Sequence, residues 1–195
     1  MTLQIDDAGV GDLLHGVVVG AYRLETGEFS YDLVDVEFFQ SPKFGKKAYL
    51  GKASELVMQI LDRMKVQESE PIQICSSFVF EKAVRDLEER YGKERVTVTK
   101  ITNDAQRFVE TAYLDEIRNL GYEPLEEREE KRARSFFHML RWLKQDPHRF
   151  KHAKTGWPRL KKYLKPRQSR KPSSTHGHAY HIERQTRRPF RDVPT

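Results

Sequence analysis

The stretch LQIDDAGVGDLLHGVVVGAY, residues 3–22, decides the fold of this 195-residue chain. Its beginning and its valine-rich end are both rich in β-forming residues, and a turn containing Gly9 and Gly11 separates them. A third segment of this kind, FSYDLVDVEFF at residues 29–39, follows the tight turn ETGE. Three strands joined by short turns predict an antiparallel meander at the start of the chain.

Helical and strand-like segments alternate after this meander. Apolar residues recur at helical spacing over residues 52–66, and the apolar run PIQICSSFVF at 71–80 is typical of a buried strand. A helix over 81–92, an alternating strand at 95–101 and a helix over 102–122 follow. Strands connected through helices pair in parallel. We therefore expect an α/β fold with a mixed five-stranded sheet, three antiparallel strands and then parallel ones, with flanking helices.

The opening motif IDDAGVGDLLHGVVVGA resembles that of the type 2 ribonucleases H. In that family an apolar strand runs into Asp-Glu-Ala-Gly, a basic residue and Gly, and a short loop leads to a valine-rich strand. A second match is the pair Asp104-Ala105 at the start of the helix after the fifth strand. The resemblance covers residues 3–120 and implies a ribonuclease H-like fold. It also implies that Asp6, Asp7 and Asp104 are catalytic and hold Mg²⁺ or Mn²⁺, with Gly9, Val10 and Gly11 against the nucleic acid.

The chain departs from the family pattern at two positions. Val10 stands where the family has a basic residue, and Cys75-Ser76-Ser77 stands where it has a third Asp, with Ser76 as the closest counterpart. Two-metal phosphodiester hydrolysis needs several converging carboxylates. Two functions therefore stay open: a metal-dependent nuclease acting on RNA or an RNA–DNA hybrid, or a catalytically degenerate nucleic-acid-binding protein of the same fold.

Each carboxylate also has a purely structural interpretation. Neighbouring strand residues point to opposite faces, so Asp6 and Asp7 can be the solvated end of a strand. Asp104 can be a helix N-cap. Glu81 and Glu55, early in the two preceding helices, are reserve ligands for a cation.

Charge divides the sequence into two unlike parts. Residues 1–130 contain 16 Lys and Arg against 26 Asp and Glu, whereas residues 131–195 contain 19 against 3. We divide the chain into a ribonuclease H-like domain at 1–124, a charged amphipathic helix at 125–146 and a basic tail at 147–195. Bases interleaved with aromatic rings are typical of nucleic-acid binding. The candidate residues for this are Arg141, Trp142, Arg149, Lys151, Trp157, Arg159, Lys161, Lys162, Lys165, Arg167 and Arg170.

The basic part also has other interpretations. It can bind RNA or a larger ribonucleoprotein particle, dock on the protein's own acidic part, or bind an acidic protein, in which case the protein is an adaptor. The single cysteine, Cys75, excludes an internal disulfide, and neither a membrane span nor a signal pattern is present in the sequence. We therefore expect a cytoplasmic protein with no membrane partner.

Overall fold

The computed structural model describes residues 1–126, 128 and 130–164, and for Arg159, Lys161 and Leu164 it describes the backbone alone. Five strands form one sheet: β1 (Leu3–Ala8), β2 (Val17–Arg23), β3 (Phe29–Val34), β4 (Ile72–Cys75) and β5 (Val96–Thr99). The helices are α1 (Ala48–Arg63), α2 (Glu81–Tyr91), α3 (Asp104–Asn119), α4 (Arg132–Gln145) and α5 (Lys161–Leu164). Short 3₁₀ turns include η1 (Val36–Phe39), η2 (Phe78–Phe80) and η4 (Pro147–His152).

The strand order across the sheet is β3-β2-β1-β4-β5. β1 pairs antiparallel with β2, placing Asp6 opposite Gly20 and Asp7 opposite Val19. β4 joins the other edge of β1 in parallel, and β5 pairs in parallel with β4. The predicted mixed five-stranded sheet is thus confirmed. β1 is central, so the two acids lie at the carboxyl end of a strand with neighbours on both sides.

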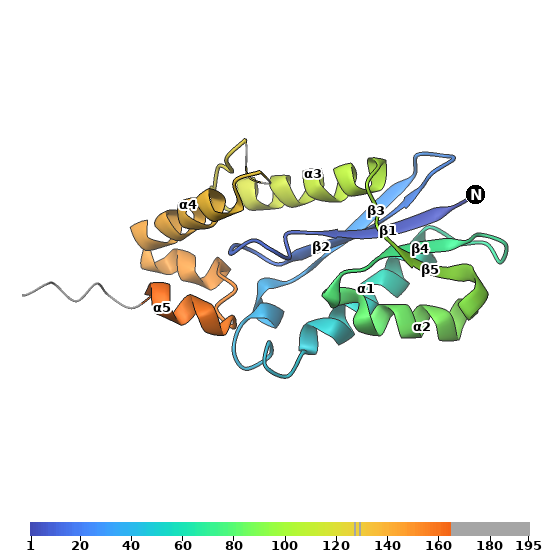
Figure 1. The fold of residues 1–195 in the computed structure, drawn as a ribbon, viewed down its shortest axis with the longest axis horizontal. Helices are drawn as coiled ribbons and strands as arrows, with labels where there is room; N and C mark the ends of the chain where they lie inside the picture. The colour runs from blue at the N-terminus through green and yellow to red at the C-terminus, as the bar shows by residue number, and fades with distance from the viewer. Residues whose placement is uncertain (127, 129, 165–195) are drawn as a thin grey trace, which may run out of the picture. The chain divides into compact units, whose positions relative to one another are not determined.

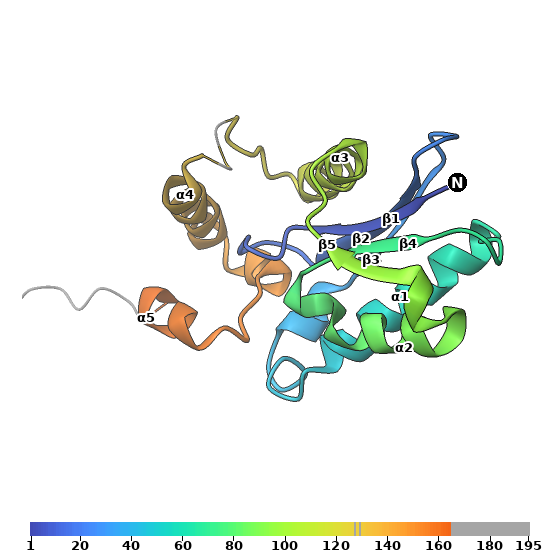
Figure 2. The same cartoon turned by 45° about the vertical axis from the view of Figure 1, so that its right-hand side comes forward.

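Helices cover both faces of the sheet (Figures 1 and 2). α1 and α2 pack on one face, where Leu3 and Ile5 of β1 join a large apolar cluster. α3 packs on the other face, where Ala8 joins a second cluster with residues of α3 and α4. Alternating residues of β1 therefore face different clusters, as the pleat of a strand requires. No helix in the described part of the chain is long and apolar enough to cross a bilayer.

Residues 147–164, which begin the predicted basic tail, pack onto the rest of the protein. Ala153 and Leu160 are buried in the second cluster, and residues 1–164 form one compact unit. A β-bridge pairs Ala153 with Leu14, immediately after the glycine turn. Residues 147–164 therefore pack on the rest of residues 1–164 through apolar side chains and a backbone bridge.

Two predicted strands are shorter in the structure. β3 ends at Val34 because the Asp35 side chain accepts a hydrogen bond from the Glu37 backbone N–H at 2.8 Å, and this cap begins η1. The predicted strand 71–80 ends at Cys75, and its second apolar part forms η2. The alternation of acidic and apolar residues at 35–39, which predicted a strand, is that of a 3₁₀ turn in which Val36 and Phe39 are buried.

Candidate metal centre and adjoining cleft

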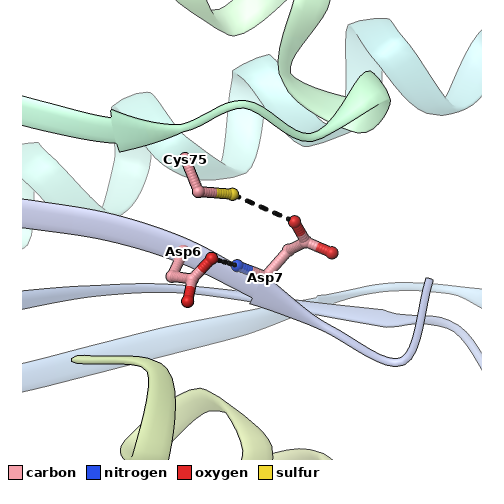
Figure 3. Close-up of side chains that lie close together, drawn as sticks. All are labelled: Asp6, Asp7 and Cys75. Carbon is pink, nitrogen blue, oxygen red and sulfur yellow. Dashed lines mark hydrogen bonds between the residues drawn. The ribbon is translucent and has the colours of Figure 1, made fainter. Parts of the chain in front are cut away.

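Asp6 and Asp7, at the end of β1, lie beside Cys75 at the end of β4 (Figure 3). Their ligand atoms all lie within 4.8 Å of one another. The Cys75 thiol donates to the Asp7 carboxylate over 3.2 Å, and the Asp6 carboxylate accepts the Asp7 backbone N–H over 2.9 Å. The two acids leave β1 in opposite directions, and the bond from the Asp7 N–H holds the Asp6 carboxylate close to its neighbour. Parallel pairing of β1 and β4 is what places the cysteine here.

Burial opposes negative charge on all three side chains. It raises the pKa of Asp7 to about 6, although hydrogen bonds from Ser77 and Cys75 lower it. It raises the pKa of Asp6 in the same way. It also raises the pKa of Cys75, and the negative charges of Asp7 and Asp6 raise it further, so this side chain is a thiol at neutral pH. The group therefore has unfavourable negative charge that a bound cation would offset.

The donor set fits one divalent cation. Two carboxylates supply the oxygen ligands that Mg²⁺ and Mn²⁺ prefer. The sulfur of Cys75 is a softer donor that suits Mn²⁺ or Zn²⁺ better than Mg²⁺. A second cation needs further carboxylates, and the group of residues within reach contains none besides Asp6 and Asp7 among the described residues.

The structure does not bring Asp104 into this group. Asp104 is the first residue of α3, its side chain is exposed, and it forms an ion pair with Arg107 at 2.9 Å. The N-cap is Asn103 instead, whose side chain accepts the Ala105 backbone N–H. Of the reserve ligands, Glu55 pairs with Lys52, and Glu81, the first residue of α2, is exposed.

Cys75, and not Ser76, faces the carboxylates. Ser76 is exposed, one residue beyond the end of β4. Because successive side chains of a strand point to opposite faces, a shift of one residue along β4 decides which side chain faces the acids. Ser76, the residue that the sequence offered as the closest counterpart of the family's third Asp, is not in this group, and Cys75 is a candidate ligand that the sequence did not single out.

The glycine turn follows directly from Asp7. Gly9 has a positive φ of 88°, and a Cβ at this position would lie 2.2 Å from the ring of Tyr113. That ring is buried, and its hydroxyl donates to the Leu14 carbonyl at 2.9 Å. Gly11 differs, because a Cβ there would meet nothing within 4 Å. Gly9 is thus required by packing, and Gly11 leaves the turn open on its outer side.

The side chain of Lys154 supports this turn through hydrogen bonds to its backbone. Its side chain is fully buried, and its ammonium donates to the carbonyls of Gly9 and Asp12. Its backbone N–H donates to the Leu13 carbonyl at 2.9 Å, so both its main chain and its side chain fix the segment after β1. Burial lowers the pKa of Lys154 to about 7, against the opposing influence of Asp12 and Asp7.

A cleft of about 330 Å³ opens beside the turn. Arg128 lines it, and its guanidinium pairs with Asp12 at 3.0 Å and with Glu110 at 2.5 Å. The same guanidinium lies 5.2 Å from the centre of the Tyr113 ring. The full lining is Asp7, Ala8, Gly9, Val10, Gly11, Asp12, Gln106, Glu110, Arg128, Arg132 and Phe136. The three predicted residues of the glycine turn thus share one cleft with Asp7.

Two of the aromatic residues predicted to contact nucleic acid are engaged within the protein. The Trp142 indole donates to the Gly121 carbonyl at 3.1 Å, and the Arg149 guanidinium covers its ring at 4.3 Å from the centre. Trp157 is half-buried against the second apolar cluster. Their ring faces are therefore partly occupied by the protein itself.

The structure describes the side chains of only some of the remaining basic candidates. Arg141, Lys151 and Lys162 are exposed. The side chains of Arg159 and Lys161, and the residues Lys165, Arg167 and Arg170 with the rest of 165–195, lie outside the described part.

Comparison with models of known protein families finds no match for this chain, and comparison with curated proteins finds none either.

Proposed function

We propose that the protein is a metal-dependent nuclease that cleaves phosphodiester bonds in RNA or in an RNA–DNA hybrid. The observation that carries this proposal is the position of the Asp6–Asp7–Cys75 group, which adjoins an arginine-lined cleft through Asp7. The mixed sheet and the opening motif agree with the resemblance to type 2 ribonucleases H. A divalent cation held by Asp6 and Asp7 would polarise a phosphoryl oxygen and make a water molecule a better nucleophile.

The chain's own residues supply substrate binding. Arg132 and Arg128 line the cleft and attract phosphate, although Arg128 is also paired with Asp12 and Glu110. The open outer side of Gly11 lets a nucleic-acid backbone approach the turn without a side chain in the way. Tyr113 and Lys154 hold the turn in place, so the backbone beside Asp7 is ordered before substrate arrives.

A second function is a nucleic-acid-binding protein with a degenerate site. Cys75 favours it, because a thiol stands beside Asp6 and Asp7 where two-metal chemistry needs another carboxylate. Exposed Asp104, paired with Arg107, favours it for the same reason. Both functions share the cleft and differ in whether bound substrate is cut.

Cleavage of a labelled RNA–DNA hybrid, and of a DNA duplex with one embedded ribonucleotide, decides between them. The reaction is run in Mg²⁺ and in Mn²⁺ with the wild type, Asp6→Asn and Asp7→Asn, and binding to the same substrates is measured. We expect metal-dependent cleavage by the wild type and none by either variant. Tight binding without cleavage in either metal would establish the degenerate protein, and absence of both would refute both functions.

Asp104→Asn and Asp115→Asn complete the series. Both aspartates are exposed on α3 and paired with an arginine three residues later, so Asp115 is the matched control. We expect a smaller loss for Asp104→Asn than for Asp6→Asn, and no loss for Asp115→Asn. Equal losses for Asp104→Asn and Asp6→Asn would place Asp104 in the catalytic group.

A further inference from the structure

We propose that the rings of Phe136, Phe137 and Tyr163 form a stacking platform for unpaired bases of a single-stranded nucleic acid leading into the cleft. This inference rests on the proposed function, because it names the form of nucleic acid that the same cleft takes. The partner is a single strand of RNA or DNA, bound through its bases.

The three rings form one cluster at the α4 and α5 end of the protein. Phe136 and Phe137 meet edge to face with centres 5.4 Å apart, and Tyr163 lies 5.3 Å from Phe136 and 5.8 Å from Phe137. Phe137 is 51% exposed, although the same helix buries Met139, Leu140 and Leu143. Adjacent Phe and Tyr rings with an exposed member offer the π-faces on which bases stack.

Phe136 connects the platform with the candidate metal centre. It is half-buried, and its side chain lines the same cleft as Asp7 and Gly11. A strand whose phosphates lie along the cleft therefore reaches Phe136, whose ring contacts that of Phe137.

The charge around the platform suits a polyanion. Residues 131–164 contain 11 Lys and Arg against one acidic residue, Asp146. The Lys162 ammonium lies over the Tyr163 ring at 4.7 Å, and exposed Arg141 lies four residues after Phe137, on the same side of α4. This positive charge favours nucleic acid over an apolar partner, which would have to bury these cations.

Fluorescence anisotropy with labelled oligonucleotides in a metal-free buffer tests the platform. The probes are a single strand, the same strand with abasic sites, a blunt RNA–DNA hybrid and a hybrid with a single-stranded overhang. The variants are Phe137→Leu and Tyr163→Leu. Phe78→Leu is the control, because Phe78 is a similarly exposed phenylalanine, at 42%, that contacts Tyr49 away from the platform.

We expect Phe137→Leu to weaken binding of the single strand and the overhang about tenfold, as loss of one stacked base would. We expect Phe137→Leu to bind the abasic strand and the blunt hybrid as tightly as the wild type does, with the same dependence of binding on salt concentration. Equal binding by Phe137→Leu and wild type, or an equal loss on the abasic strand, would refute the platform while leaving cleavage of the blunt hybrid intact. A wild type that binds none of the probes would instead refute the proposed function itself.

Discussion

The ammonium of Lys154 lies 3.1 Å from the carbonyl oxygen of Asp12, a residue 142 positions earlier in the chain. With its second bond to the Gly9 carbonyl, this side chain spans the turn that separates the candidate metal ligands from β2. A lysine from the basic part of the sequence, residues 131–195, thus helps to fix the turn in the acidic part, residues 1–130.

Replacing Lys154 with methionine tests this support. The variant removes the hydrogen bond that the partly buried Asp12 carbonyl accepts from Lys154, while the Gly9 carbonyl keeps its bond from the Asp12 backbone N–H, and loss of a hydrogen-bond partner costs about 1–3 kcal/mol. We expect the free energy of unfolding to fall by about 1–3 kcal/mol, measured by chemical denaturation. Exposed Lys151, in the same segment, supplies the control Lys151→Met, which should match the wild type. Equal stability of the two variants would show that the turn does not depend on Lys154.

The two glycines of the turn should respond differently to alanine. Gly9→Ala puts a methyl group against the Tyr113 ring at a positive φ, so we expect a loss of about 2 kcal/mol or more in stability. Gly11→Ala meets nothing within 4 Å and should leave the melting temperature unchanged. Its effect should appear in nucleic-acid binding instead. A destabilised Gly11→Ala would contradict the open outer side of the turn.

The stability of the metal-free protein should depend on Asp7 in a defined pH range. Its pKa rises from 3.8 to about 6 on folding, so the folded state holds this proton more tightly than the unfolded state. The contribution of Asp7 to stability is therefore most favourable below about pH 4 and declines as the pH rises to about 6, by about 3 kcal/mol in total.

Asp7→Asn removes this decline. At pH 7 in a chelating buffer, the variant should exceed the wild type in stability by up to about 3 kcal/mol, and the difference should vanish below pH 4. Denaturation curves at several pH values measure it, with Asp115→Asn as the exposed control. Added Mn²⁺ should stabilise the wild type and leave Asp7→Asn unchanged. A wild type that is the more stable of the two at pH 7 would mean that the buried carboxylate is already compensated by its neighbours.

Cys75→Asp should strengthen magnesium binding. The substitution puts a third carboxylate beside Asp6 and Asp7, and Mg²⁺ prefers oxygen over sulfur ligands. We expect lower stability without metal, from the added buried negative charge, and Mg²⁺ affinity raised about tenfold or more in titration calorimetry. Cys75→Ser, which adds no charge, serves as the control. Unchanged Mg²⁺ affinity in Cys75→Asp would argue against a cation between these three positions.

The sheet was predictable because period-two alternation and short turns are local properties of the sequence. Asp6, Asp7 and the glycine turn were identifiable for the same reason, since they follow one another directly. Cys75 was not identifiable in this way. Whether Cys75 or Ser76 faces the acids depends on the register of β4, and a shift of one residue turns each side chain to the opposite face of the sheet.

Lys154 lay beyond sequence reasoning for a different reason. Lysine in a basic segment is normally exposed, and its burial here depends on Gly9 and Asp12 at the opposite end of the described chain. The contact of Asp104 with Arg107 likewise depends on which residue caps α3, and both Asn103 and Asp104 were suitable.

The bridge between Leu14 and Ala153 has a consequence for biosynthesis. A ribosome releases the chain from its N-terminus, so the sheet residues can pair long before residue 153 emerges. Until then the turn beside Asp7 lacks both its bridge partner and its lysine. A nascent chain that has released only the sheet residues therefore has Asp6 and Asp7 without the contacts of Ala153 and Lys154. The candidate metal centre therefore gains its complete surroundings only after residue 154 has left the ribosome.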